Sequence, residues 1–309
     1  MKIVIAIGGN MISDASNKEE TFNEQLIRAK NTAKIISSIM SAGHQVVITH
    51  GNGPQVGSLL LQQAAHTPGS IELPLNVLGA LTQGQIGIML QHALINEFQE
   101  RNIDSQVYIV PTTVFVDAAD PGFKNPTKPI GPFYNKEEYD ALDKTNKVYA
   151  ELPKGFRRVV ASPFPHEMLE APVIEDLVDK GNLIIAVGGG GSPTVKNSNG
   201  SIQLVDAVID KDLASAVLAE KINADMLLIL TNVDGVFENF NTKDQQLISK
   251  LKLEDAEKML ETDLLGAGSM KPKLRACVTF VKNGKSAGIT SPDFALQTVN
   301  GNAGTIIVS

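Results

Sequence analysis

The sequence has a single cysteine, no tryptophan and no long apolar run. Because Cys277 stands alone, no intrachain disulfide is possible, and we expect a reducing compartment, the cytoplasm. No apolar run approaches the roughly 18 residues that a transmembrane helix needs, so we expect no membrane span. The short apolar start, MKIVIAIGG, lacks the layout of a signal peptide and is typical of a first strand.

Positive charge is also in the minority. The net charge of −7 and the pI near 5.3 argue against a basic face that binds nucleic acid. A phosphate site in such a chain must concentrate its cations locally. With 309 residues, of which 43% are hydrophobic and 20% charged, the chain can bury a large core as one α/β domain or as two lobes.

Several familiar site motifs are missing too. There is no GxxxxGK[ST] for a P-loop, no GxGxxG with an acidic partner for a dinucleotide and no GxSxG for acyl transfer. The five histidines lack metal-ligand spacing and cysteine partners. His50, beside GNGP, could act in acid–base catalysis, but local packing or hydrogen bonding is the interpretation that we favour.

What the chain does have is a regular alternation of strand and helix patterns, which predicts a mainly parallel sheet with helices on both faces. Strands are expected at Ile3–Ile7, Val46–Thr49, Val107–Val110, Val159–Ala161, Leu183–Val187, Leu227–Leu230 and Thr305–Val308. Helices are expected at Asn23–Ala42, Gln55–Ala65, Leu78–Asn102, Ile174–Lys180, Lys211–Ile222 and Pro272–Asn283. The exception is Asp117–Gly155, which is rich in Pro, Gly and Lys and has little period of its own. So long a segment indicates a lid or a small subdomain.

Glycine loops end three of the expected strands. Gly8-Gly9-Asn10 follows the first, Gly51-Asn52-Gly53 follows the second, and the run that contains Gly189 and Gly190 follows the strand at 183–187. Each loop alone could be a tight turn. Since α/β sheets bind ligands at the carboxyl ends of their strands, three such loops indicate one shared site.

The stretch DAVIDKDLASAVLA, residues 206–219, predicts a helix with Asp210 as its N-cap. Lys211 then lies in the first turn, where the helix dipole disfavours a cation unless an anion binds there. Asp212 could hold this lysine in position. The alternative is a solvated Lys-Asp pair on the surface.

Two further lysines lie in loops with Pro and Gly: Lys128 in PTKPIG and Lys273 in GSMKPK. Each alone could be solvated. Together with Lys211 and the glycine loops they favour phosphoryl transfer, which depends on positioning and on neutralising spread negative charge. The residues therefore predict a kinase without a P-loop.

At this point the chain resembles a known family, the carbamate kinases of the amino-acid kinase superfamily. The resemblance rests on GGN, THGNGPQVG, NPTKPIGPFY, RRVV, AVGGGG, AVIDKDLAS, LTNVDGVFENF, GSM-PK and the GTIIV ending. It implies a three-layer αβα sandwich, made of one domain over residues 1–309. Residues 1–205 would form the acceptor lobe, 206–309 the nucleotide lobe and 125–156 a protruding subdomain.

The resemblance also implies a reaction and its residues. Mg²⁺, bound to phosphates without direct protein ligands, would support transfer between carbamoyl phosphate with ADP and carbamate with ATP, in a homodimer that serves arginine or agmatine breakdown. Lys128, Lys211, Asp212 and Lys273 would be catalytic. The acceptor and phosphoryl end would be lined by Gly8, Gly9, Asn10, Gly51, Asn52, Gly53, Gly189 and Gly190. The nucleotide would meet Lys211, Asn232, Val233, Phe237, Ala267, Met270 and Lys273.

The sequence departs from the usual family pattern at several positions. Ser192 stands in place of Ile, Asn232 in place of Asp, and Lys271 in place of Gly. None of these changes removes a predicted catalytic lysine. Two alternatives stay open: a kinase of another small acid, such as N-acetylglutamate, and a nucleotide-binding sensor without turnover.

Overall fold

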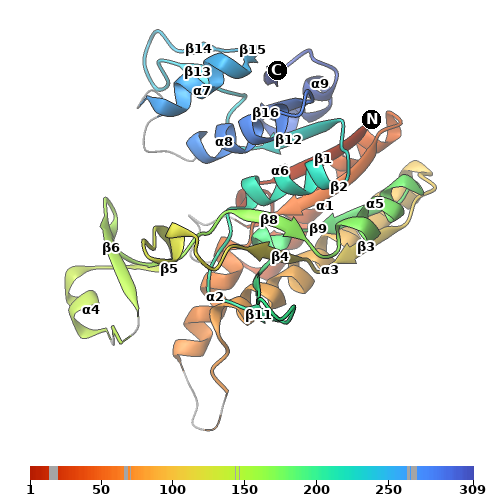
Figure 1. Cartoon of the computed structure of the whole chain (residues 1–309). Coiled ribbons are helices and arrows are strands. Elements are labelled where there is room, and N and C mark those ends of the chain that lie inside the picture. The colour runs from red at the N-terminus through yellow and green to blue at the C-terminus, as the bar shows by residue number, and fades with distance from the viewer. Residues whose placement is uncertain are drawn as a thin grey trace.

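The computed structural model describes residues 1–13, 20–65, 69, 71–142, 144–145, 147–262, 265 and 270–309. An eight-stranded sheet runs through the middle of the molecule (Figure 1). Across the sheet the order is β15 (Lys250–Lys252), β17 (Thr305–Val308), β16 (Ser286–Thr290), β12 (Met226–Leu230), β1 (Lys2–Ile7), β2 (Gln45–His50), β9 (Leu183–Ala186) and β3 (Val107–Val110). All neighbours are parallel except β16 and β17, which confirms the mainly parallel sheet.

The alternation of side chains along β1 explains why helices cover both faces of this sheet. Val4 and Ala6 point into one apolar core, while Ile3, Ile5 and Ile7 point into another. The first core is closed by α5 (Ala171–Asp179), α6 (Lys211–Lys221), α7 (Leu253–Glu261) and α8 (Met270–Val281). The second is closed by α1 (Phe22–Ser41), α3 (Leu75–Arg101) and α9 (Ala295–Val299). The result is the αβα sandwich.

Smaller elements surround the sandwich. A second sheet has the order β11 (Ile202–Leu204), β10 (Ser192–Lys196), β4 (Thr113–Val116) and β8 (Pro165–Met168). Strands β13 (Phe237–Glu238) and β14 (Gln246–Leu247) form a separate pair, and α2 (Gly53–Ala64) follows β2. Short 3₁₀ turns lie at Gly9–Met11, Pro121–Phe123, Gly188–Gly190 and Pro292–Phe294. Among the helices of the described ranges, none combines the length and the apolarity that crossing a membrane requires.

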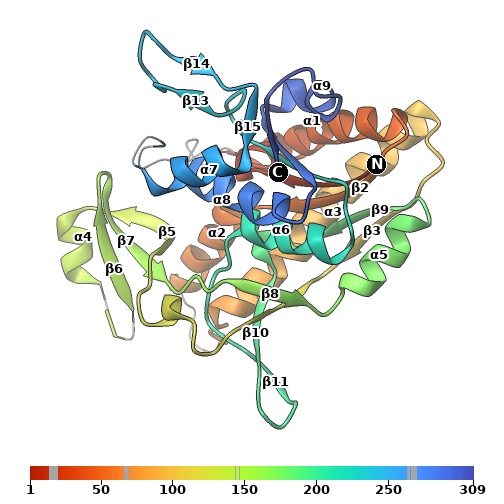
Figure 2. The same cartoon turned by 45° about the horizontal axis from the view of Figure 1, so that its top comes forward.

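The segment that seemed aperiodic in the sequence carries regular structure, which corrects the expectation. It contains β5 (Lys128–Tyr134), α4 (Lys136–Ala141) and β6 (Val148–Leu152), and β7 (Gly155–Val160) completes an antiparallel sheet of order β5-β7-β6. This sheet projects from the body in both views (Figures 1 and 2). The strand predicted at Val159–Ala161 therefore belongs to the projecting sheet, and not to the main one.

An aromatic cluster gives the projecting sheet a small core of its own. The ring of Tyr139 stacks on Phe156 at 4.1 Å between centroids, and Tyr149 meets Tyr139 edge-on at 5.6 Å. Such pairs add stabilisation beyond the area that they bury. We refer to residues 128–160 as the projecting subdomain.

Candidate functional site

The three glycine loops meet at the carboxyl ends of β1, β2 and β9, as predicted. A Cβ atom built on Gly51 would lie 3.4 Å from the backbone nitrogen of Gly9, and one on Gly188 would lie 2.6 Å from the His50 ring. At Gly189, whose φ is +65°, a Cβ would come within 2.2 Å of Asn52 Nδ2. A side chain at Gly188 or Gly189 would therefore overlap His50 or Asn52 and push these loops apart.

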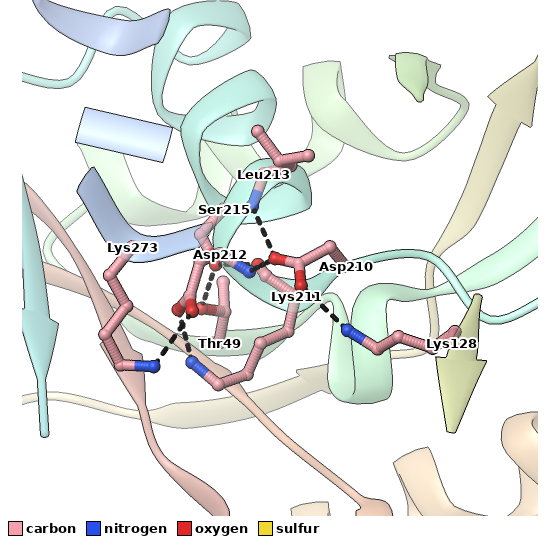
Figure 3. A network of polar contacts seen from close by, with 8 residues as sticks. All are labelled: Thr49, Lys128, Asp210, Lys211, Asp212, Leu213, Ser215 and Lys273. Atoms are coloured by element: carbon pink, nitrogen blue, oxygen red, sulfur yellow. Dashed lines mark hydrogen bonds and ion pairs between the residues drawn. The ribbon is translucent and has the colours of Figure 1, made fainter. Parts of the chain in front are cut away.

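Asp210 begins α6 and connects it to the projecting subdomain. Its Oδ1 accepts hydrogen bonds from the backbone nitrogens of Asp212 (2.9 Å) and Leu213 (3.3 Å), which confirms the predicted N-cap. Its Oδ2 accepts from Lys128 Nζ at 2.7 Å. Figure 3 shows this carboxylate between the helix start and the lysine.

Two opposing effects set the pKa of Asp210. Burial raises the pKa, but the charge and the hydrogen bond of Lys128, with help from the charge of Lys211, outweigh burial and hold the pKa below its ordinary value. Asp210 is therefore ionised at neutral pH and keeps its ion pair with Lys128.

Asp212 holds two lysines at once. Lys211 Nζ binds one oxygen of this carboxylate, and Lys273 Nζ lies 3.4 Å from the other (Figure 3). The Asp212 side chain is only 4% exposed, and those of Lys211 and Lys273 are 15% and 10% exposed. The local charge is therefore positive and poorly shielded by water, which favours an anion beside the two ammonium groups.

A chain of hydroxyl groups fixes the first turn of α6 to β2. Ser215 Oγ donates to the backbone oxygen of Lys211 at 2.6 Å, and the oxygens of Ser215 and Thr49 lie 2.5 Å apart. Because the single hydroxyl hydrogen of Ser215 goes to Lys211, Thr49 donates to Ser215. Thr49 precedes the loop that contains Gly51, so these hydroxyl groups connect that loop to Lys211.

A cavity of about 270 Å³ opens in front of these groups. Four cationic side chains and two carboxylates line it, which is the local concentration of positive charge that an acidic chain needs for a phosphate site. Its lining consists of Gly51, Asn52, Gly53, Val56, Lys128, Pro129, Ile130, Arg157, Gly189, Val208, Ile209, Asp210, Lys211, Asp212, Pro272 and Lys273. The four residues predicted to be catalytic are thus brought together.

His50 lies behind the cavity and does not line it. Its side chain is buried, and Nδ1 lies 3.0 Å from the backbone oxygen of Gly51. Burial lowers its pKa to about 4, and the charge of Lys211 acts in the same direction. The imidazole is neutral near pH 7, which agrees with the packing interpretation.

The other residues predicted to bind the acceptor, Gly8, Gly9, Asn10 and Gly190, do not line the cavity. Gly9 lies beside Gly51, a Cβ on Gly8 would lie 3.4 Å from the backbone oxygen of Leu230, and a Cβ on the buried Gly190 would lie 2.4 Å from that of Ile209. Asn10 belongs to the first 3₁₀ turn, and its side chain lies outside the described residues.

Of the predicted nucleotide residues, Lys211 and Lys273 line this cavity, whereas Asn232, Val233, Phe237 and Met270 do not. Asn232 is exposed and Val233 half-buried in the segment after β12, and Phe237 lies in β13 beside Phe240. Met270 begins α8 and packs against the first apolar core. Ala267 lies outside the described residues.

Sequence reasoning missed two residues of the site. Asp210 was predicted as a helix cap, but not as the partner of Lys128, because the two are 82 positions apart. Arg157 lines the cavity from β7, and its Nε donates to the backbone oxygen of Gly131 at 2.9 Å. Burial lowers the pKa of Arg157, but a guanidinium keeps its charge at neutral pH. The only signal for Arg157 was its place in RRVV.

Comparisons with known proteins identify the family and the fold of the chain. The model of the amino acid kinase family matches residues 1–291. The chain is 44% identical to a carbamate kinase of Thermococcus kodakarensis over 99% of both chains, and 44% identical to one of Clostridium perfringens over the full length of both. Among solved structures, a carbamate kinase from Giardia lamblia bound to AMP-PNP superposes with a TM-score of 0.90 at 40% identity, covering 99% of this chain and 98% of that one.

Proposed function

The chain belongs to the amino acid kinase family and, within it, to the carbamate kinases, so it is a kinase; from this premise we propose that it transfers a phosphoryl group reversibly between carbamoyl phosphate with ADP and carbamate with ATP. The observation that carries the proposal is the pair of lysines, Lys211 and Lys273, held by one buried carboxylate at the floor of the cavity. A transferring phosphoryl group spreads its charge over three oxygens, and two fixed cations stabilise that charge without reorganising.

Asp212 acts as the positioning group of the pair. Without it, two ammonium groups in a poorly hydrated site would repel each other. With it, the two lysines keep their separation while a net positive charge remains for the phosphoryl group. The hydroxyl chain from Thr49 through Ser215 fixes the backbone of Lys211 in the same way.

Lys128 and Arg157 approach the cavity from the projecting subdomain. We propose that they bind the phosphate of carbamoyl phosphate, with Lys128 held in place by Asp210. Since both come from one subdomain, binding of substrate would be linked to the position of that subdomain.

The glycine loops would bind the acceptor. Gly51 allows the stem of Lys211 to lie against the backbone, since a Cβ there would lie 3.3 Å from Lys211 Cδ. Asn52 is held by its bond to Thr82 Oγ1 at 2.8 Å and faces the cavity beside Gly189. The backbone N–H groups of glycine loops suit carboxylate and phosphoryl oxygens. The roles of Gly8, Gly9, Asn10, Gly53 and Gly190 stay proposals of the same kind.

We propose that the lobe formed by residues 206–309 binds the nucleotide. The residues proposed to contact it are Asn232, Val233, Phe237, Ala267 and Met270. The support for this proposal is that the Giardia relative is described as bound to AMP-PNP and that it superposes over nearly the whole chain. Lys273, in the first turn of α8, would then lie between the nucleotide and the phosphoryl group.

We propose that Mg²⁺ enters with the nucleotide. The carboxylates that line the cavity, Asp210 and Asp212, are each paired with a lysine. This donor set suits a cation whose ligands are phosphate oxygens rather than side chains. When bound, Mg²⁺ would supply further charge neutralisation on the phosphates.

Three finer points are also proposals. Synthesis of ATP during breakdown of arginine or agmatine, in the cytoplasm, rests on the family alone.

A homodimer is supported by an exposed apolar stripe on α3. The stripe consists of Leu81, Ile88 and Ile95, which lie seven residues apart and expose 51%, 51% and 39% of their surface. A solution mass that stays at 33.0 kDa would contradict the dimer.

The test of the reaction is ATP formation from carbamoyl phosphate, ADP and Mg²⁺ by the wild-type protein and by Lys211→Ala, with Lys258→Ala as an exposed control. We expect synthesis by the wild type and the control and its loss in Lys211→Ala. A folded, ADP-binding wild type that makes no ATP would contradict the proposal, and a panel of small acids, including N-acetylglutamate, would then identify the acceptor.

A further inference from the structure

A second cavity, of about 560 Å³, lies on the other side of β5 from the candidate active site. Its walls come from the projecting subdomain on one side, and from α2 and the segment that leads into α3 on the other. Ile130 lines both cavities, so β5 is a shared wall. The volume falls within the usual range for small-molecule sites.

The charges around this cavity are divided between its two sides. The subdomain contributes Arg158 and Lys147, whereas the body contributes Glu72 and Asp206. No ion pair joins the two groups in the part of the chain that the structure describes. The cavity therefore separates a cationic wall from an anionic one. A ligand that carries both charges, one at each end, would complement it.

Arg158 supplies the most specific observation. Its Nε is buried and has no hydrogen-bond partner within the described ranges. A buried charged donor without a partner is costly, and it becomes favourable when an acceptor arrives. A guanidinium binds carboxylates best, because its parallel N–H groups match the two oxygens. Arg158 lines the cavity and leaves this donor unpaired, so its guanidinium favours a carboxylate as the ligand group.

Tyr134 adds a neutral donor to the same wall. Burial raises the pKa of its phenol, although the charge of Arg158 acts in the opposite direction. The phenol thus stays protonated and can donate to an anion beside Arg158. Leu60 and Pro132 supply apolar surface nearby, which suits a side chain of modest size.

From these contacts we propose that the second cavity binds a free amino acid. Its carboxylate binds Arg158 and Tyr134 on the subdomain, and its ammonium group lies near Glu72 and Asp206 on the body. The bound molecule bridges the two parts of the protein.

A ligand that bridges the two parts also affects the position of Lys128, and this step rests on the proposed function. Lys128 begins β5, two residues before the shared Ile130, and meets Asp210 across the active cavity. A ligand that holds the subdomain against the body favours the arrangement in which this ion pair forms. The amino acid therefore lowers the KM for carbamoyl phosphate, by population shift.

Binding is measured by calorimetry on the full-length protein, with the twenty amino acids as probes, and then with the N-acetyl and amide forms of whichever binds. Glu72→Gln changes an exposed side chain on the anionic wall and is expected to leave the fold intact, and Arg158→Gln changes the cationic wall. Lys136→Gln is the control, because Lys136 is an exposed cation of the same subdomain that does not line the cavity.

We expect at least one amino acid to bind, with affinity lowered about tenfold or more by each wall variant and by each blocked form, and unchanged in Lys136→Gln. If none of the twenty amino acids binds, the proposed site is wrong. The site is also wrong if an amino acid binds but its affinity is the same in Glu72→Gln and in Arg158→Gln as in the wild type. Kinetics with the bound amino acid decide the coupling separately: an unchanged KM would overturn it. Because calorimetry needs no turnover, failure of the site and failure of the proposed reaction are distinguishable.

Discussion

Lys211 and Lys273 bind opposite oxygens of the same buried carboxylate, Asp212, although 61 positions separate Asp212 from Lys273. Lys211 comes from the first turn of α6 and Lys273 from the first turn of α8, and these helices pack side by side in the first apolar core. The packing of the two helices therefore sets the spacing of the two charges. The fold thus places two cations at a fixed separation at the floor of the cavity.

The first prediction concerns this pair. Lys211→Ala and Lys273→Ala should each lower kcat by roughly 10²–10³-fold with a smaller change in KM, because each removes charge stabilisation made mainly in the transition state. Steady-state kinetics in the direction of ATP synthesis measure the effect. Lys258→Ala, at an exposed lysine, serves as the matched control. Normal turnover in both variants would refute the assigned roles.

The second prediction concerns Asp210 and Lys128. Asp210→Asn keeps an oxygen that can cap α6 but removes the negative charge that holds Lys128 at 2.7 Å. We expect a Tm close to that of the wild type and a KM for carbamoyl phosphate raised about fivefold, as for loss of a partly exposed ion pair.

A double-mutant cycle with Lys128→Met tests whether the two residues act as a pair. If they do, the effects on KM should be clearly less than additive, because either change alone already breaks the contact. Fully additive effects would mean that Asp210 and Lys128 act independently.

Local patterns explain how much of this site could be predicted from the sequence. The N-cap at Asp210 and the meeting of the glycine loops follow from short-range signals and from the parallel sheet, and both are confirmed. The partner of Lys128 depends on where the projecting subdomain folds back, and no local signal encodes this. Arg157 and Arg158 are neighbours on one strand, yet they line different cavities. In a strand, successive side chains point to opposite faces.

Two strands that the sequence patterns did not predict, β5 and β16, have a similar explanation. β5 contains Pro129 and Pro132, which weaken a strand pattern but are tolerated because β5 is an edge strand of its sheet. β16, with the sequence SAGIT, has small residues where apolar ones would give a clear pattern, and Gly288 lies close to Met226 and Leu228 of the neighbouring strand. Tertiary packing overrides weak local propensity in both strands.

The third prediction concerns His50 and pH. Its pKa is 6.5 in an ordinary environment and about 4 in the folded protein. Between these values the unfolded chain binds a proton that the folded protein does not, so stability falls as the pH drops from 6.5 to 4. The loss should be on the order of 3 kcal/mol for this group.

Urea unfolding at a series of pH values measures this loss. His50→Gln cannot titrate, so its stability should fall less steeply over the same range. His166→Gln, at an exposed histidine, should follow the wild type. Equal slopes for His50→Gln and the wild type would show that His50 does not carry this pH dependence.

The fourth prediction concerns Gly189, where the backbone has a φ of +65° and a Cβ would overlap the side chain of Asn52. Gly189→Ala should therefore destabilise the protein by roughly 1–3 kcal/mol, through overlap and backbone strain. It should also impair activity, because the displaced amide of Asn52 loses its bond to Thr82 and its place at the cavity. Thermal unfolding and kinetics measure the two effects.

A second substitution separates overlap from strain. Asn52→Ser, with a shorter side chain, should recover much of the Tm lost in Gly189→Ala but none of the activity, because the amide is then gone. The control is Gly84→Ala in α3, where a Cβ meets nothing within 4 Å and the helix should gain up to about 1 kcal/mol. If the double variant is no more stable than Gly189→Ala, then contact with Asn52 is not why this position must be glycine, and the left-handed backbone alone requires it.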